Sequence, residues 1–427
     1  MFNKKLPGVY LQKNKETANL KSEKLPTPSE VVIPLLQHIG KPCIPIVSEK
    51  QKVIIGEKIA KPNELGAPIH ASVCGTVKKI EEITLPDGKM SPAIIIEADG
   101  EKKTEEQKPI NISTTAEFIE AVCECGAVGL GGAGFPTHKK MSLFYKNPRS
   151  IIINCAECEP YITSDTRTLA DKSTLLYKGI LLLKKYLKPE DITLAVEKEN
   201  ETAKSILKSI ADDLNFLKFK VLPSKYPQGS EKVLIYNILK KTVMENEHPT
   251  DLGVLVINST TLIAISEYIN CGKPLYEKLI TVSGNAIKNP KNLIAPIGTK
   301  IEDVINFCEV DTETIEKILL GGPMMAFAAA SLKMPIEKRH NALLLFDKAI
   351  SKPHPTTACI RCGKCISVCP VLLDPVAISK AYEERDIDML RRVKPNICIE
   401  CGCCSYVCPT YQPLVERNKL AKALLKN

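Results

Sequence analysis

The sequence predicts a multidomain protein in which an α/β domain is combined with small β modules and a cysteine-rich helical module at the C-terminus. Three observations support this. A chain of 427 residues exceeds one ordinary domain, short apolar runs broken by Gly and Pro precede alternating strand-like and helix-like segments, and one cysteine pattern occurs twice near the C-terminus. We expect four domains, at residues 1–105, 110–265, 270–345 and 350–427.

Composition predicts a protein of a reducing compartment. The sequence contains no run of ~18 uncharged apolar residues and no apolar signal core in its first twenty residues, so we expect a cytoplasmic protein without a membrane span. Eight of the 17 cysteines lie in motifs that require reduced thiolates, which excludes an extracellular disulfide scaffold. The net charge of +9 suits acidic electron carriers or an anionic membrane face. Scattered lysines, the absence of Trp and an aromatic content of 5% disfavour nucleic acid.

Two copies of C-x2-C-x2-C-x3-C-P define the C-terminal module. Such a run supplies three thiolates to one [4Fe–4S] cluster and its fourth to the other cluster. Structural zinc is the alternative, and it is disfavoured because both motifs are complete and Pro follows each fourth cysteine. Cys403 falls off the spacing and is not expected to be a ligand. The predicted ligand sets are Cys359, Cys362, Cys365 and Cys408 for one cluster, and Cys369, Cys398, Cys401 and Cys404 for the other.

Residues 31–97 consist of short strand-like runs. Segments such as K-V-I-I-G-E-K-I-A and A-S-V-C-G-T-V are separated by Gly and Pro, which indicates a small β sandwich or barrel. Their pairing looks like a barrel-sandwich hybrid of the biotinyl/lipoyl type. No lysine stands where such domains carry their prosthetic group, so a carrier role is not expected.

A glycine-rich loop, G-L-G-G-A-G-F-P-T-H-K-K, ends at Lys140. A predicted helix precedes this loop, whereas the glycines of a Rossmann fingerprint follow a strand and open a helix. Backbone without Cβ atoms can still approach a flat ring or a phosphate, with Lys140 as a point charge. A turn without a ligand is the alternative. The candidate glycines are Gly129, Gly131, Gly132 and Gly134.

A predicted buried strand ends at Asn154 and leads into C-A-E-C-E-P-Y. The carboxylates of Glu157 and Glu159 are expected to accept hydrogen bonds from ribose hydroxyls or a carboxamide, and an ordinary charged loop is the alternative. Strands and helices continue to alternate through Y-P-Q-G-S-E, which contains Gly229 and Glu231, and complete the α/β domain.

Two further segments are placed by their patterns. Residues 279–311 alternate strands with one short helix, which suggests a small β-grasp-like module. Residues 376–393 are predicted to form a helical spacer between the cysteine motifs.

The ordered motifs resemble the C subunit of the Rnf (Rsx) electron-transport complex. The residues that carry this resemblance span nearly the whole chain: G-L-G-G-A-G-F-P-T-H-x-K, N-x-A-E-C-E-P-Y, Y-P-Q-G-x-E-K, V-x-G-x-A-I-K-N-P-K-N, G-G-P-M-M and the two cysteine motifs. More distantly, G-G-A-G-F-P-T, the glutamate loop and the later Gly-x-Glu resemble the flavin- and NADH-binding subunit of respiratory complex I, a family that also has β-grasp modules of the SLBB type.

The resemblance implies an FMN- and NADH-binding central domain. FMN would lie along the glycine loop, with Lys140 near its phosphate and Asn154 near the flavin. NADH would stack on the flavin beside the two glutamates of the loop, and Gly229 and Glu231 would close the pocket. The implied activity is that of an NADH dehydrogenase-type oxidoreductase, in which the flavin splits a hydride pair into single electrons for the two clusters.

The sequence leaves two alternatives for the electron acceptor. One is the set of membrane subunits of an Rnf-type complex, at the cytoplasmic face of the membrane, and the other is a soluble selenol- or thiol-dependent reductase such as D-proline reductase. Unusual cysteines suggest the soluble relative, and we hypothesise that Cys74 or the Cys155/Cys158 pair is redox active; inert buried thiols are the alternative. Cys123 and Cys125 are also additional to the family pattern. A non-enzymatic iron–sulfur scaffold without flavin is the competing function.

Overall fold

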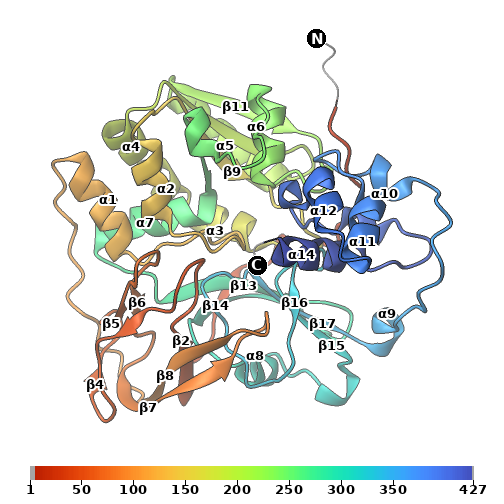
Figure 1. The fold of residues 1–427 in the computed structure, drawn as a ribbon. Coiled ribbons are helices and arrows are strands. Elements are labelled where there is room, and N and C mark those ends of the chain that lie inside the picture. The colour runs from red at the N-terminus through yellow and green to blue at the C-terminus, as the bar shows by residue number, and fades with distance from the viewer. Residues whose placement is uncertain (1–4, 426–427) are drawn as a thin grey trace.

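The computed structural model describes residues 5–425, whose strands form sheets of six, four, four and three strands. Figure 1 shows the small β domain at the lower left, the parallel-sheet domain above it, a mixed sheet below, and the cysteine-rich helices at the right. The cysteine-rich helices lie against the rest of the molecule on one side and are open on the other.

The small β domain has two sheets around one core, as the sequence predicted. The sheets have the orders β2-β8-β7-β4 and β3-β5-β6, and Val31, Ile59 and Ile94 are buried between them. The strands are β2 (Glu30–Pro34), β3 (Ile44–Pro45), β4 (Lys52–Val53), β5 (Lys58–Lys61), β6 (Ile69–His70), β7 (Gly75–Thr84) and β8 (Met90–Ala98).

The central domain contains a parallel sheet in the order β11-β10-β9-β12. Ile151 and Ile153 enter one hydrophobic core and Ile152 enters another, so both faces of β9 are covered by helices. The elements are β9 (Ser150–Cys155), β10 (Asp191–Glu197), β11 (Leu217–Leu222), β12 (Val254–Asn258), α1 (Thr115–Glu124), α2 (Thr137–Phe144), α3 (Ser164–Asp171), α4 (Ser173–Leu187), α5 (Glu201–Asp213), α6 (Glu231–Leu239) and α7 (Ser259–Cys271).

The strand order of this sheet reverses at β9. The chain moves from β9 to β10 and β11 on one side and then returns to β12 on the other. In open α/β sheets ligands bind outside the carboxyl ends of the strands at such a switch point. The fold therefore predicts a ligand site at the ends of β9 and β12.

The predicted helix before the glycine loop is confirmed as α1. Thr114 caps it by accepting a hydrogen bond from the amide of Glu117, whose carboxylate accepts one from the amide of Thr114. Such a capping box satisfies two backbone donors that a helix start leaves free. Phe118 and Val122 are buried on one face, and the Phe118 ring stacks on Tyr186 at 5.1 Å between centroids.

The mixed sheet is larger than the module predicted over residues 279–311. Its order is β1-β14-β13-β17-β15-β16, and β1 pairs in parallel with β14 although it lies near the N-terminus of the chain. Strands β13 and β14 and the short helix α8 confirm the predicted alternation. The elements are β1 (Ser22–Lys24), β13 (Glu277–Ser283), β14 (Lys291–Pro296), α8 (Ile301–Phe307), β15 (Lys317–Leu320), β16 (Phe327–Ala328) and β17 (Ala342–Phe346).

The cysteine module contains short helices. The helical spacer predicted over residues 376–393 is confirmed, but it is divided into two helices. Arg385 takes a left-handed φ of 53°, and Asp386 starts the second helix by accepting a hydrogen bond from the Met389 amide at 2.8 Å. No described helix is long and apolar enough to cross a membrane. The helices are α9 (Lys348–Ser351), α10 (Lys364–Ser367), α11 (Pro375–Glu383), α12 (Ile387–Val393), α13 (Cys403–Tyr406) and α14 (Leu414–Leu424), and one-turn 3-10 helices lie at Pro249–Leu252, Thr312–Thr314 and Pro395–Ile397.

A buried lysine joins three parts of the fold. Lys338 precedes β17, and its ammonium group donates to the carbonyls of Pro68 at 2.6 Å and Gly126 at 2.8 Å, which belong to the small β domain and the central domain. Its backbone amide donates to the side chain of Gln37 at 2.9 Å. Burial lowers the pKa of Lys338 to about 8, because the charged form loses its hydration.

We expect Lys338→Met to destabilise the protein by about 2 kcal/mol at pH 7, because two buried carbonyls lose their donor. Urea unfolding measures the loss. Lys333→Met, at an exposed lysine of the same segment, is the control and should change stability by less than about 0.5 kcal/mol. Equal midpoints for the two variants would contradict the inferred role of Lys338.

The same site should make stability depend on pH. The pKa of Lys338 is about 8 in the folded chain, whereas an unfolded lysine titrates near about 10.4, so the unfolded chain binds more protons between these values. Stability of the native protein should therefore rise between about pH 8 and pH 10, by at most about 1.4 kcal/mol per pH unit. Lys338→Met should lack this contribution. The difference in unfolding free energy between the variant and the native protein should therefore grow as the pH rises from about 8 to 10.

Candidate functional site

Two asparagines lie at the switch point of the parallel sheet. Asn154 at the end of β9 donates to the Gly229 carbonyl at 2.9 Å and accepts from the Ala156 amide at 3.0 Å. Asn258 at the end of β12 donates to Asp165 at 2.7 Å. The structure thus brings Asn154 and Gly229 together, as the sequence predicted, and adds Asn258.

The glycine loop lies directly against Asn258. A Cβ atom at Gly131 would come within 3.1 Å of the Asn258 amide nitrogen, and the Leu130 amide donates to Thr261 in the first turn of α7 at 3.0 Å. The loop is closed by bonds from Gly129 to the Phe135 carbonyl and from Gly134 to the Gly129 carbonyl, both 3.0 Å. The backbone is thereby held beside the N-terminus of α7, where N–H groups favour an anion.

The tip of this loop is open. Gly131 and Gly132 are exposed, and a Cβ atom at Gly132 would meet nothing within 4 Å. Gly132 has a φ of 106°, a conformation that favours glycine. A flat ring or a phosphate can therefore approach this backbone closely, so the site fits a flavin nucleotide.

Asn258, Thr260 and Thr261 belong to the site but were not identified from the sequence. Asn258 caps α7 by accepting from the Thr261 amide at 3.1 Å, and the Thr260 hydroxyl donates to Asp165 at 2.7 Å. The pattern V-L-V-I-N-S-T-T, an apolar strand followed by an N-cap residue, was the available signal.

Lys140 and Glu231 form a pair beside β12. The Lys140 ammonium group donates to the Val256 carbonyl at 2.9 Å and lies 2.7 Å from a carboxylate oxygen of Glu231. Glu231 opens α6, next to the loop of Gly229. The two predicted cofactor-binding residues therefore meet each other.

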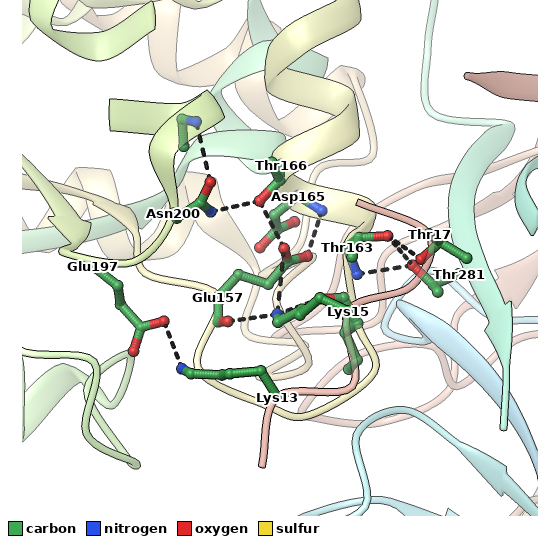
Figure 2. A network of polar contacts seen from close by, with 12 residues as sticks. Lys13, Lys15, Thr17, Glu157, Thr163, Asp165, Thr166, Glu197, Asn200 and Thr281 are labelled. Carbon is green, nitrogen blue, oxygen red and sulfur yellow. Dashed lines mark hydrogen bonds and ion pairs between the residues drawn. The ribbon is translucent and has the colours of Figure 1, made fainter. Parts of the chain in front are cut away.

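Glu157 faces a buried polar network, shown in Figure 2. Its carboxylate accepts hydrogen bonds from the Asp165 amide at 2.8 Å and the Thr166 hydroxyl at 2.7 Å, and the Lys15 ammonium group lies 3.7 Å away. Lys15 also donates to the carbonyls of Glu157 and Ile162. Burial raises the pKa of Glu157 to about 7, against the opposing effect of Lys15.

Glu159 has different partners. One carboxylate oxygen accepts from the Met324 amide at 3.1 Å and the other lies 3.4 Å from the Tyr226 hydroxyl. Burial raises the pKa of Glu159 to about 7. The Tyr226 hydroxyl donates to the Cys401 carbonyl at 2.8 Å, so Glu159 lies where the central domain meets the cysteine module. The two glutamates therefore have separate hydrogen-bond partners, although the charge of Lys15 lowers the pKa of both.

The eight motif cysteines line two cavities in the crossed sets that the spacing predicted. Four thiols surround each cavity, which suits a cubane cluster. No group of three or more His, Cys, Asp or Glu side chains within residues 5–425 is arranged to hold a single metal ion. One cavity is lined by Cys359, Cys362, Cys365 and Cys408, and the other by Cys369, Cys398, Cys401 and Cys404.

Backbone donors point at both thiol sets. The amides of Leu373, Glu400 and Gln412 donate to the sulfurs of Cys369, Cys398 and Cys408 at 3.3 to 3.4 Å. Such bonds favour thiolate ligands and tune cluster potentials. The residues therefore fit two [4Fe–4S] clusters.

The cysteines proposed as redox active lie in poor surroundings for a thiolate. Cys155 and Cys158 are buried, and burial raises the pKa of both thiols to about 12. Cys74 is buried and donates to the Lys103 carbonyl at 2.9 Å. Reactive cysteines are usually exposed and have lowered pKa values, so these contacts support inert packing.

Three family models match the chain. Residues 122–267 match the Nuo51 FMN-binding domain, residues 4–101 match the RnfC barrel sandwich hybrid domain, and residues 354–409 match a 4Fe-4S dicluster domain. A solved NAD+-reducing [NiFe]-hydrogenase in the H2-reduced state has a related fold, with a TM-score of 0.50 and 19% identity over 73% of this chain and 62% of that one.

Curated relatives match most of the chain. The C subunit of a proton-translocating ferredoxin:NAD(+) oxidoreductase complex from Clostridium ljungdahlii is 37% identical over 87% of this chain and 83% of its own length. The C subunit of a Na(+)-translocating ferredoxin:NAD(+) oxidoreductase complex from Acetobacterium woodii is 36% identical over 84% of this chain and 82% of its own length. The C subunit of an ion-translocating oxidoreductase complex from Pseudomonas aeruginosa is 34% identical over 86% of this chain, which spans only 49% of that relative.

These matches establish the cofactors of the chain as FMN, NADH and two [4Fe–4S] clusters. The cavities and the glycine loop described above agree with them. Which side chains contact each cofactor is a prediction that variants can test.

Gly229→Ala should reduce the amount of bound FMN about fivefold, which corresponds to about 1 kcal/mol of binding free energy. A Cβ atom at Gly229 would lie 2.8 Å from the Ala156 carbonyl and would separate the loops that meet at Asn154. Flavin released on denaturation measures the effect. Ser230→Ala is the control, because the Ser230 side chain makes no capping hydrogen bond, and it should retain the flavin.

Cys401→Ser should lower the iron content from about eight to about four atoms per chain, because the second cluster loses a ligand. Cys403→Ser should keep both clusters, although Cys403 is buried and lines the same cavity. Iron analysis and low-temperature electron paramagnetic resonance measure both variants. Cluster loss in Cys403→Ser alone would reverse the ligand assignment.

Proposed function

Because the chain belongs to the family of C subunits of Rnf-type ion-translocating oxidoreductases, we propose that it oxidises NADH and passes single electrons through its two clusters to a membrane partner in such a complex. It is an oxidoreductase, and its NADH-linked electron transfer follows from its family and cofactors. The observation that carries the proposed route is the hydrogen bond from Tyr226 to the Cys401 carbonyl, which joins the loop of Gly229 to a cluster ligand.

The switch point supplies the groups that would hold FMN. When bound, FMN accepts a hydride pair from NADH and releases electrons singly. The exposed backbone at Gly131 and Gly132 would lie against it, the N-terminus of α7 would attract its phosphate, and Asn154 would donate near its ring. Lys140 adds a positive charge that Glu231 orients.

Glu157 supports this site through its neighbours. It accepts from the Asp165 amide, and Asp165 in turn accepts from Asn258 and Thr260, which border the glycine loop. Glu157 thereby fixes the first turn of α3, and we assign it a positioning role. The catalytic role predicted for Glu157 and Glu159 in contacting the dinucleotide stays a prediction.

Electrons would enter the cysteine module at the set that contains Cys401. This set packs against the central domain: Cys401 and Cys403 share a buried cluster with Tyr226, Cys158 and Val9. This buried contact joins the flavin-binding domain to the second thiol set without an intervening exposed surface.

The membrane complex is the favoured acceptor. The relatives belong to ion-translocating complexes, and a peripheral place on the cytoplasmic face of the membrane agrees with that family. The soluble alternative, a reductase such as D-proline reductase, was suggested by additional cysteines. Cys155 and Cys158 are buried and their thiol pKa values are raised to about 12, which argues against a thiol relay to such a reductase.

NADH added to the anaerobic protein should bleach the flavin band and then the iron–sulfur bands. Tyr226→Phe should leave flavin reduction unchanged and slow cluster reduction about tenfold, because it removes the hydrogen bond that holds the flavin loop against the cluster ligand. Stopped-flow absorbance separates the two phases. Tyr406→Phe, at an exposed tyrosine of the same module, should match the native protein. An unchanged spectrum after NADH addition would leave the flavin-free relay as the function.

A further inference from the structure

A cavity lies between the central domain and the mixed sheet. Its walls come largely from α3 and α7, which Figure 1 shows above β13 and β14, the strands that complete it. Leu130 of the glycine loop belongs to the lining, whereas Gly131, Gly132 and Asn154 do not. The cavity is therefore distinct from the exposed face of the loop that is proposed to hold FMN.

The cavity has room for a small molecule. Its volume is about 100 Å³. A protein cavity of ~150 Å³ holds one benzene molecule, so this one suits a ligand of about six non-hydrogen atoms or fewer. Buried side chains of Ile263, Leu275 and Leu279 make much of the inner wall apolar. Pockets between domains that combine an apolar wall with a few polar groups are typical sites for small ligands.

The carboxylates that line the cavity already have partners. They stand at its rim, where each pairs with a basic side chain, so none of them is free to bind a cationic ligand. These pairs are Glu267 with Lys172, Glu277 with Lys273, and Asp171 with Arg167.

One cation of the lining lacks such a partner. Lys278 of β13 is 5% exposed, and its ammonium group donates to the carbonyls of Leu130 and Lys338, both at 2.8 Å. An ammonium group has three donors, so one stays available. Burial lowers the pKa of Lys278 to about 7, and Asp165, which favours the charged form, is not within ion-pair distance. A buried charge without a counter-ion is costly, and an anion in the cavity would supply one.

A second polar group of the wall is also unused. Thr168 is 7% exposed, and its hydroxyl makes no hydrogen bond within the part of the chain that the structure describes. Helix α3, which carries Thr168, packs against β13, which carries Lys278. Buried hydroxyls normally have a partner, so this one points to a missing acceptor. The wall thus offers two unused donors beside apolar surface.

We propose that this cavity binds a small monocarboxylate with a short apolar chain, and that the bound acid steadies the glycine loop. The carboxylate would accept hydrogen bonds from the Lys278 ammonium group and the Thr168 hydroxyl. Its alkyl chain would pack against Ile263 and Leu279. A carboxylate satisfies both donors at once, which neither an apolar molecule nor a cation can do.

The effect on the loop follows from the position of Lys278. Its ammonium group holds the carbonyl of Leu130, which directly precedes the exposed Gly131. Hydrogen bonds from a charged donor are about twice as strong as neutral ones, so an acid that keeps Lys278 charged also tightens this bond. This effect rests on the proposed placement of FMN along the loop, whereas the binding site stands without it.

The test uses butyrate as the probe and butyramide as a neutral molecule of the same size, with the anaerobic, cofactor-loaded protein. Butyrate should bind with a dissociation constant of about 1 mM, a reasonable value for so small a ligand. Butyramide should bind at least about tenfold more weakly, because it brings no counter-charge. Isothermal titration calorimetry measures both. Equal affinities would overturn the assignment of a carboxylate, and absent butyrate binding would leave a water-filled cavity.

Variants place the bound acid in the cavity. Ala264→Leu fills the cavity from α7 and should abolish butyrate binding. Thr168→Val preserves side-chain volume and should weaken binding about fivefold, because it removes one donor. Lys278→Met should abolish binding, and the other two variants decide the matter if it does not fold. Lys288→Met, at an exposed lysine in the turn between β13 and β14, is the control and should bind butyrate like the native protein. Undiminished binding in Ala264→Leu would overturn the site.

Flavin retention reports on the loop. With saturating butyrate the native protein should retain FMN about fivefold more tightly, measured by the fluorescence of flavin released on serial dilution. Ala264→Leu should retain FMN equally with and without butyrate. Unchanged retention in the native protein would overturn the effect on the loop. The proposed function fails separately, when NADH does not bleach the protein, because butyrate binding requires no electron transfer.

Discussion

The hydrogen bond between Tyr226 and the Cys401 carbonyl is the constraint on which the arrangement of the domains depends. Tyr226 is almost completely buried among apolar side chains that include Val9 and Cys403. A buried hydroxyl requires a partner, and this one is met by a backbone carbonyl of the cysteine module at 2.8 Å. A shift of the module would leave the Cys401 carbonyl without this donor, so the bond fixes the flavin-binding loops relative to the cluster ligands.

A second constraint comes from residues 9–24, an N-terminal segment that contacts both the central domain and the mixed sheet and is called the strap below. The backbone of Val9 pairs with Tyr226, and Lys13 pairs with Glu197 at 3.1 Å. Lys15 reaches Glu157, after which β1 joins the mixed sheet. Burial of the Glu157 carboxylate is costly, and the positive charge and hydrogen-bond donors around it offset that cost. The strap therefore stabilises the buried network beside the switch point.

The features that sequence reasoning found are those set by local spacing. Thiolates at fixed intervals of two and three residues must surround a small centre, so the crossed cysteine sets were predictable. The contact between Lys15 and Glu157 joins residues 142 positions apart, and no local pattern reports such a distance. Glu157 and Glu159 illustrate the limit. Their residue type predicted polar contacts, but only the tertiary structure shows that Glu157 joins a buried polar network and that Glu159 lies where the central domain meets the cysteine module.

The two cysteine sets also differ in their surroundings. Both sets receive N–H bonds at sulfur, so burial is the main contrast between them. A site that accepts an electron gains negative charge, which a buried, apolar environment destabilises more than an exposed one beside Arg361 and Lys364. We infer that the buried set is harder to reduce than the exposed set. The set beside Tyr226 would then receive electrons less readily than the set that contains the exposed Cys359 and Cys362.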